Sequence, residues 1–203
     1  MKRALLIVLC LSTTIVSYAG FGIRLSGGLA LAVPDNKQYI ILDQKVKPNY
    51  AASFKVYYDV LKLEIGLGVD MMKLSTSLPN DWEAVYADPA IPVYAFVNKK
   101  HRFIKSDIDY GLTAGYMFSR TDGVKNHGDY SLPSNSGITA GLQLGGNINI
   151  TKGFGINIEA GARYASLGYV PKPDPNFPGS PSNEKVRQNM FYFPVLLGFR
   201  FEM

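Results

Sequence analysis

Residues 138–164 read ITAGLQLGGNINI, TKG and FGINIEAGARY, two alternating segments joined by a short turn. Every second residue from Ile138 to Ile150, and again from Phe154 to Tyr164, is apolar or glycine. The residues between them are polar, charged or small, and they include Gln143 and Glu159. Because successive side chains of a β-strand point to opposite faces, this spacing predicts two strands with one apolar and one polar face.

Eight segments of the chain share this alternation. Their apolar positions hold no Asp, Glu, Lys or Arg, although 18% of the whole chain is charged. An uncharged face on every strand indicates contact with hydrocarbon rather than with water. The segments are Phe21–Val33, Tyr50–Val60, Leu61–Met71, Ile91–Val97, Ile108–Phe118, Ile138–Ile150, Phe154–Tyr164 and Phe191–Met203.

The connections between these segments alternate in length. The short ones are the direct junction at Val60-Leu61, the basic segment Asn98–Asp107, and Thr151–Gly153; the long ones are Pro34–Asn49, Met72–Ala90, Ser119–Gly137 and Gly168–Met190. Such alternation predicts an up-and-down order with four long loops at one end, and three short turns and both termini at the other. Closure into a ring removes exposed sheet edges and satisfies the backbone inside a bilayer. We therefore predict an all-β fold, an eight-stranded antiparallel transmembrane β-barrel.

Aromatic residues on the apolar face cluster near the two ends of the predicted strands, with mainly aliphatic residues between. This distribution is typical of the two interfacial girdles of a transmembrane barrel. The short-turn group is Phe21, Tyr58, Tyr110, Phe154 and Phe201, and the long-loop group is Tyr50, Tyr116, Phe118, Tyr164 and Phe193.

The first 19 residues have the features of a secretory signal peptide. Lys2 and Arg3 precede the short apolar run 4–11, and Ser17-Tyr18-Ala19 supplies small residues at a cleavage site. We expect a signal peptide over 1–19 and one barrel domain over 20–203. Removing the two basic residues lowers the formal charge of +5 by two, and no long basic run follows, so nucleic acid is not an expected partner.

The polar face carries charges of both signs, interleaved with glycines. Eight strands enclose an interior just wide enough for side chains, so we expect these charges to pair as a plug rather than to line an open conduit. The predicted lumen network comprises Arg24, Lys55, Asp59, Lys62, Glu64, Asp70, Asp109, Glu159, Arg163, Arg200 and Glu202, with the polar residues Gln143, Asn147, Asn149 and Asn157.

We predict no catalytic residues, no cofactor site and no metal site. The strongest candidate for chemistry is His127, which lies among acidic and hydroxyl residues in the third long loop. Neighbouring residues of one loop rarely reach the geometry of a nucleophile, base and orienting group. The long loops instead offer aromatic and proline residues for a surface partner, and the candidate contacts are Trp82, Tyr86, Tyr169 and Phe177.

The last predicted strand ends in a pattern of glycine, aromatic residue and apolar terminus, formed by Gly198, Phe201 and Met203. With the leader and the eight strands, the chain resembles small bacterial outer-membrane barrels of the OmpA-transmembrane or OmpX type and the broader porin-like family. The resemblance implies contact with outer-membrane lipid and insertion by the outer-membrane assembly machinery, with these three residues as the assembly signal.

The expected function is a non-enzymatic structural or surface-interaction role in the bacterial outer membrane. Three alternatives stay open at this point. A narrow passive channel would conduct through the polar lumen. A lipid-modifying enzyme would depend on His127. A soluble barrel of lipocalin type would turn the apolar face inward and the charges outward.

Overall fold

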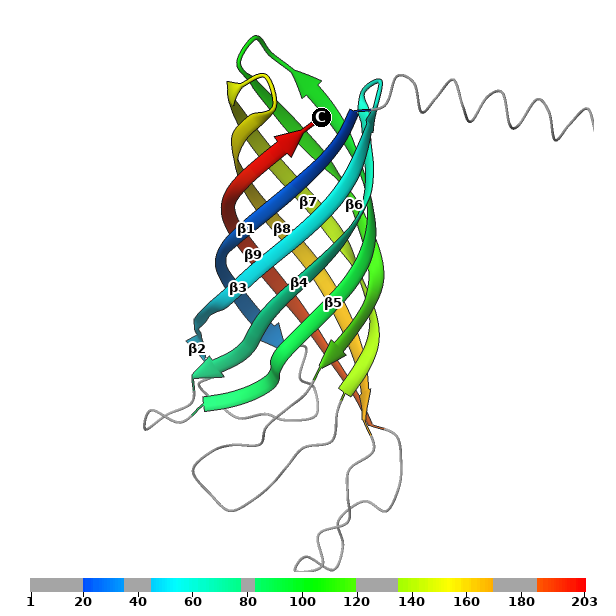
Figure 1. The fold of residues 1–203 in the computed structure, drawn as a ribbon. Coiled ribbons are helices and arrows are strands. Elements are labelled where there is room, and N and C mark those ends of the chain that lie inside the picture. Colours follow the sequence, from blue (N-terminus) through cyan, green and yellow to red (C-terminus); the bar gives the residue numbers. More distant parts are fainter. Residues whose placement is uncertain (1–19, 35–44, 78–82, 120–134, 170–185) are drawn as a thin grey trace, which may run out of the picture.

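The computed structural model describes residues 20–34, 45–77, 83–119, 135–169 and 186–203, which form nine antiparallel strands (Figure 1). Within this part of the chain no helix is long and apolar enough to cross a membrane. The predicted signal peptide lies outside the described residues. The strands are β1 (Gly20–Pro34), β2 (Lys45–Val46), β3 (Pro48–Val60), β4 (Leu63–Ser77), β5 (Glu83–Arg102), β6 (Ser106–Ser119), β7 (Asn135–Thr151), β8 (Phe154–Tyr169) and β9 (Val186–Glu202).

Eight of these strands close into one ring, in the order β1, β3, β4, β5, β6, β7, β8 and β9. The ring closes where β1 pairs with β9, for example Gly28 with Leu196. The two-residue strand β2 lies outside this ring order and continues the β3–β4 hairpin, since Val46 pairs with Thr76. The predicted eight-stranded antiparallel barrel is therefore confirmed, with β2 as a short addition.

The short turns all lie at one end of the barrel, which we call the short-turn end, beside the end of β9 (Figure 1). They join β3 to β4, β5 to β6, and β7 to β8. We call the opposite end the long-connection end, because the longer intervening segments of the sequence connect the strands there. The predicted alternation of connections holds in this arrangement.

Several strands are longer than predicted. Strand β4 continues to Ser77 and β5 begins at Glu83, so most of the predicted long loop 72–90 is β-structure. Strand β5 also continues to Arg102 through the segment predicted as a turn. Pairing of the extended β5 with β4 and β6 satisfies its backbone groups, which outweighs the prolines and charges that suggested loops.

The apolar face of the strands points outward. Leu67, Leu112 and Leu142 are 60–64% exposed, whereas Arg24 and Glu64 on the other face are at most 1% exposed. This orientation is the opposite of a soluble barrel with an apolar interior, so that alternative is wrong. Within the described strands the charges lie mainly in the lumen and at the rims, and the outer wall between the rims is apolar.

At each end of the barrel, aromatic rings of neighbouring strands contact one another on the outer wall. At the short-turn end Phe21 packs edge-on against Tyr58, with 5.6 Å between ring centroids. At the long-connection end Tyr164 lies 5.2 Å from Phe191. These cross-strand contacts link neighbouring strands at both predicted interfacial levels.

Candidate functional site in the barrel lumen

The polar side chains of the lumen form layers along the barrel axis, and the middle layer centres on Arg24. Its guanidinium donates to Glu64 at 2.6 Å and to Asp109 at 3.1 Å. The amide of Asn98 donates to both of the same carboxylates, at 3.2 and 3.0 Å. Two buried carboxylates thus share one cation and one amide, an arrangement that compensates their loss of hydration.

A second group in the middle layer centres on Lys55. Its ammonium contacts both carboxylate oxygens of Glu159 at 2.5 Å and donates to Gln143 at 3.0 Å. The amide of Gln143 in turn donates to Asn98 at 2.7 Å, which joins this group to the Arg24 group. The Lys55 ammonium also lies 5.2 Å from the ring centre of Phe96, a favourable cation–π position.

The layer toward the long-connection end is built on Asp70. This carboxylate accepts hydrogen bonds from Arg163 at 2.5 Å, Tyr94 at 2.8 Å and Ser53 at 2.6 Å. The guanidinium of Arg163 lies 4.2 Å from the centre of the Tyr94 ring. Glycine at position 68 makes room for this ring, because a Cβ there would lie 2.5 Å from it.

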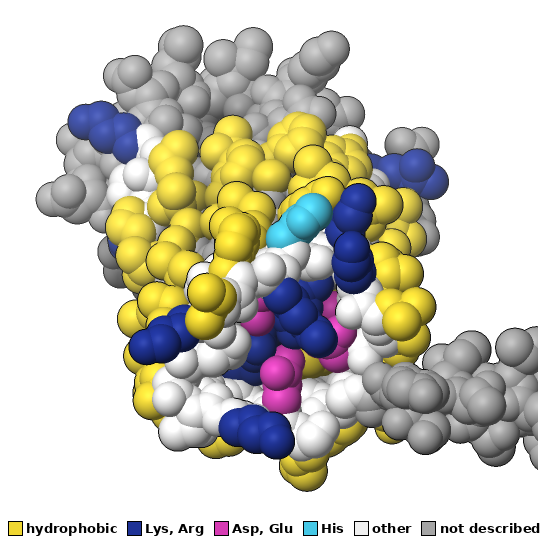
Figure 2. All heavy atoms as spheres, turned by 90° about the horizontal axis from the view of Figure 1, so that it is seen from above, with side chains coloured by type: hydrophobic (Ala, Val, Ile, Leu, Met, Phe, Trp, Pro, Cys, Tyr) yellow, Lys and Arg dark blue, Asp and Glu magenta, His cyan; other side chains and the backbone are white. Residues whose placement is uncertain are grey.

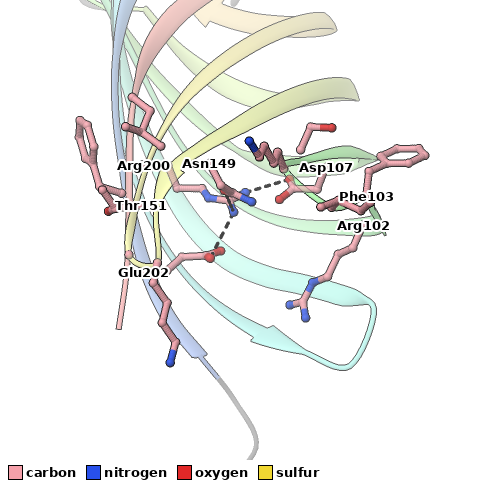
Figure 3. Close-up of a pocket in the computed structure, with 14 residues that line it drawn as sticks. Arg102, Phe103, Asp107, Asn149, Thr151, Arg200 and Glu202 are labelled. Carbon is pink, nitrogen blue, oxygen red and sulfur yellow. Dashed lines mark hydrogen bonds and ion pairs between the residues drawn. The ribbon is translucent and has the colours of Figure 1, made fainter.

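The layer at the short-turn end is partly open. Arg200 donates to Asp107 at 2.8 Å and pairs with Glu202 at 3.2 Å, and these residues line a hollow of about 600 Å³ (Figure 3). Lys100 bonds to Asp59 at 2.5 Å and to Glu202 at 3.0 Å beneath it. Figure 2 looks into this end and shows basic and acidic side chains gathered inside a ring of hydrophobic ones.

Beyond Asp70 the lumen changes character and becomes apolar. Thr139 and Tyr192 share a hydrogen bond of 2.8 Å, and the neighbouring inward side chains are methionine, leucine and alanine. Five methionine and leucine side chains of this cluster are fully buried, namely Met72, Leu74, Met117, Leu167 and Met190. The interior therefore consists of a charged segment followed by a mainly apolar one, which also holds the hydrogen-bonded pairs Asn49–Ser75 and Thr76–Tyr86.

Several of the contacts cross the whole width of the lumen. In the ring order, β1 stands opposite β6, β4 opposite β8, and β5 opposite β9. The pairs Arg24–Asp109, Asp70–Arg163 and Lys100–Glu202 join these opposite strands directly. A side chain that reaches the far wall obstructs the axis, so these pairs act together as a plug.

Most residues of the predicted lumen network lie in these layers, but Lys62 does not. It lies exposed in the β3–β4 turn, because the strand phase ends at Val60 and the turn points its side chain away from the axis. The prediction for Lys62 is therefore corrected. The network is formed by Arg24, Lys55, Asp59, Glu64, Asp70, Asp109, Glu159, Arg163, Arg200 and Glu202 together with Gln143, Asn147 and Asn149. Asn157 is also buried in the lumen, where it bonds to Ser26.

The predicted loop contact Tyr86 also needs correction. It lies in β5 with 6% of its surface exposed and shares a hydrogen bond of 3.0 Å with Thr76, so it faces the barrel interior. Trp82 and Phe177 lie outside the described residues, as does His127, and only the backbone of Tyr169 is described, at the end of β8.

The residues of the predicted assembly signal lie at the barrel seam and its rim. Gly198 in β9 packs against β1, where a Cβ would lie 2.1 Å from the Leu25 carbonyl oxygen. Phe201 points outward with 41% of its surface exposed, and Met203 is 84% exposed.

Sequence reasoning missed three central members of the network, Asn98, Lys100 and Asp107. All three fell in the segment interpreted as a basic turn. The signal was present, because the inward phase of Tyr94 and Phe96 continues unbroken to Asn98 and Lys100. Alternation carried past the last apolar residue would have placed both inside the lumen.

Among the described residues, no group of three or more His, Cys, Asp or Glu is placed to hold a metal ion. Some buried polar atoms of the network have no protein partner, including the Nε atoms of Arg24 and Arg163 and the Thr113 hydroxyl. Such atoms are the usual positions of trapped water in a polar interior.

Comparison with known proteins identifies the fold. No protein-family model matches the chain, and no curated protein matches it in sequence. Among solved structures, Neisserial surface protein A aligns with a TM-score of 0.56 over 90% of this chain and 97% of its own, at 12% identity. The outer membrane protein OprG from Pseudomonas aeruginosa aligns with a TM-score of 0.55 over 91% of this chain and 96% of its own, also at 12% identity. The chain thus has the fold of the small eight-stranded outer-membrane β-barrels.

Proposed function

We propose that this protein is a non-enzymatic, non-conducting barrel of the bacterial outer membrane that holds its four long connections at the cell surface. The observation that carries the proposal is the plug, in which buried ion pairs join opposite walls of the lumen. An uncharged outer wall with aromatic bands supports placement in a lipid bilayer. Likeness of fold to outer-membrane proteins supports the same compartment.

The plug bears on transport because each layer blocks the axis by a different means. Charged pairs such as Arg24–Asp109 obstruct the middle of the lumen. The apolar cluster around Met72 and Met117 fills the lumen on the side of the long-connection end. An ion that followed the axis would have to break buried pairs and then cross an apolar segment, and both steps are costly.

Conductance in planar lipid bilayers tests this part of the proposal. The purified protein is expected to show no discrete conductance steps. The double variant Arg24→Ser/Asp109→Ser removes one ion pair that crosses the lumen and leaves the net charge of the lumen unchanged. It serves as the control, and its ion leakage is expected to exceed that of the unmodified protein. Discrete steps in the unmodified protein, altered by substitution of Arg24 or Glu159, would replace the proposal with a narrow channel.

Placement and orientation are tested by fractionation and by epitope tags on intact cells. A tag inserted after Asn126, in the third long connection, is expected to bind antibody without permeabilising the cells. A matched tag after Lys152, in the β7–β8 turn at the short-turn end, is expected to bind only after permeabilisation. The reverse pattern, or recovery of the protein in the aqueous fraction without detergent, would contradict the proposal.

Display of the long connections suggests a surface partner, with Trp82, Tyr169 and Phe177 as candidate contacts. Proline-rich sequence around Phe177 pre-extends the backbone and lowers the entropy cost of ordering on a partner. The same barrel with alanine at these three positions should insert normally but lose adhesion to host or neighbouring cells. Unchanged adhesion would leave the barrel as a structural component of the membrane.

A further inference from the structure

The short-turn end carries a cluster of exposed basic residues that take no part in the plug. Strand β5 presents Lys99 and His101 on the outer wall, and the adjoining turns present Lys62 and Lys105. We call these four residues the basic cluster. A backbone hydrogen bond of 2.7 Å from Lys100 to the Lys62 carbonyl oxygen holds the β3–β4 turn beside the end of β5. Lys62 is thereby placed beside Lys99, whose cross-strand partner is Leu63, and Lys105 follows in the turn at the end of β5.

The charge of this patch is not compensated by side chains around it. Asp59 and Asp107 are buried beneath it, at 5% and 2% exposure, and both are bound to lumen cations. Glu202 faces the hollow and pairs with Lys100 and Arg200. Among the described residues of the short-turn end, the acidic side chains therefore point inward, while the exposed charged side chains at the rim are basic. The exposed basic side chains of the rim therefore attract anions.

The position of Lys99 and His101 indicates what kind of anion would reach them. Both side chains follow the outward phase of β5, directly beyond the apolar Val97. Lys99 pairs across the sheet with Leu63 and Tyr110, and His101 stacks on Tyr110 at 5.7 Å. They therefore lie at the level of an interfacial aromatic residue, where a lipid-exposed wall meets headgroups.

Exposed apolar residues alternate with the cations in the same turns. Leu61 is 82% exposed beside Lys62, and Ile104 is fully exposed beside Lys105, with Phe103 at 60%. Apolar side chains interleaved with lysines are typical of segments that lie in the membrane interface, where the chains enter the acyl boundary and the ammonium groups meet phosphates. A site for a soluble polyanion would leave these apolar groups in water.

The backbone at Leu61 provides an independent indication. Val60 pairs with Leu63, so the turn has two central residues, and Leu61 is held at a positive φ of 61°. Glycine is the usual residue at the first position of such a turn, because a side chain there is strained. Leu61 therefore projects an exposed apolar side chain at a position where glycine would be unstrained, which fits a contact of this side chain with lipid.

We propose that the basic cluster, with Leu61 and Ile104, binds the phosphate headgroups of anionic phospholipids in the periplasmic leaflet. The inference rests on the proposed placement in the outer membrane but adds a ligand and a site to it. Each lysine near a lipid surface attracts anionic headgroups, and the attraction falls as salt screens it. Such a site would fix the depth and tilt of the barrel at its periplasmic rim.

The test uses full-length protein in nanodiscs that contain equal amounts of phosphatidylglycerol and phosphatidylcholine. Native mass spectrometry counts the lipids of each kind that stay bound. The protein is expected to retain phosphatidylglycerol preferentially at low salt, and K62Q/K99Q/K105Q should lower that preference by about fivefold or more. The matched control is K45Q/K47Q/K73Q, which removes the same charge near the long-connection end and should keep the preference.

Several outcomes would overturn the inference. Equal retention of the two lipids by the unmodified protein, or equal loss of preference in both triple variants, would remove the site. Binding of soluble polyglutamate by protein in phosphatidylcholine nanodiscs, lost in the same variant without any lipid preference, would assign the cluster to an acidic protein partner. Heat-modifiable gel mobility shows whether each variant has folded, and bilayer conductance reports on the proposed function independently of lipid preference.

Discussion

A buried charge in this lumen is tolerated because of its partner, and Lys55 is a clear instance. Its ammonium is 1% exposed and is held by Glu159 and Gln143. The charged partners come from strands far apart in the sequence, so single-sequence reasoning predicts that the charges pair but not with which residue. Alternation identifies a face, whereas pairing depends on the shear and tilt of the closed ring.

Substitution of Lys55, alone or together with Glu159, should distinguish the cost of leaving one buried charge unpaired from the cost of removing the whole ion pair. The variant Lys55→Met leaves Glu159 buried without its main partner, and we expect it to lower the free energy of unfolding by about 3–5 kcal/mol. The double variant Lys55→Met/Glu159→Gln removes both charges and should recover most of that loss. Urea titration of the protein in lipid vesicles measures both. A double variant as unstable as the single one would show that the pair itself, not the orphaned charge, sets the stability.

Leu61 offers a second prediction at this scale. Replacement by glycine removes the strain of a positive φ and should raise the free energy of unfolding in detergent micelles by about 1 kcal/mol, offset in part by the greater freedom of the unfolded chain. If Leu61 contacts lipid, the same variant should gain less in bilayers than in micelles. An equal gain in both media would indicate that the leucine makes no contact with the bilayer.

Strands β9 and β1 form the seam that completes the barrel, and the seam depends on small residues. A side chain at position 198 would meet the backbone of β1, whereas a Cβ at Gly146 would meet only Ile158, at 3.5 Å, on the outer wall. We expect Gly198→Val to reduce the fraction of heat-modifiable, folded barrel severalfold. Gly146→Val, the matched control in β7, should fold normally. Equal folding of the two variants would show that the seam can accommodate a side chain.

Sequence reasoning located the strands better than their ends. Alternation is informative while apolar residues supply the outward face, but it fades where strands leave the predicted apolar zone. The charged end of β5 at Lys100 and the proline-containing start of β5 near Tyr86 were both interpreted as loops for this reason. Pairing with neighbouring strands extends these segments, and that stabilisation is not visible in one segment of sequence alone.

The uncharged outer wall gives a prediction for the molecule as a whole. The free energy cost of placing a charged side chain on this wall depends on how deep the position lies in the bilayer. Leu142 lies in the central part of β7 and is 60% exposed, whereas Ile150 lies beside the β7–β8 turn and is 55% exposed. In lipid vesicles Leu142→Arg should lower the free energy of unfolding by about 2–4 kcal/mol, and Ile150→Arg by about 0–1 kcal/mol. Equal effects at the two positions would contradict a membrane-spanning wall.

At this scale the sequence was most informative about the environment of each face and least informative about activity. The composition of the outward face predicted the barrel and its lipid-facing wall, since every outward position obeys the same physical constraint. The plug and the basic cluster depend on a few side chains meeting across the ring, for example Arg24 with Asp109. Such contacts require the three-dimensional closure that a linear pattern does not encode.

The pairing of β1, the first strand, with β9, the last strand, also determines when the barrel can close. Strand β1 reaches its second neighbour only when β9 is present, so an incomplete chain carries an unsatisfied strand edge and an uncovered apolar face. Adding strands one after another from the N-terminus therefore cannot close the ring before β9 is available. If the barrel lies in the outer membrane as proposed, its chain crosses the periplasm before the ring can close, and we expect a holding chaperone to protect it from aggregation. Overproduction that outruns this protection should then trigger an envelope stress response.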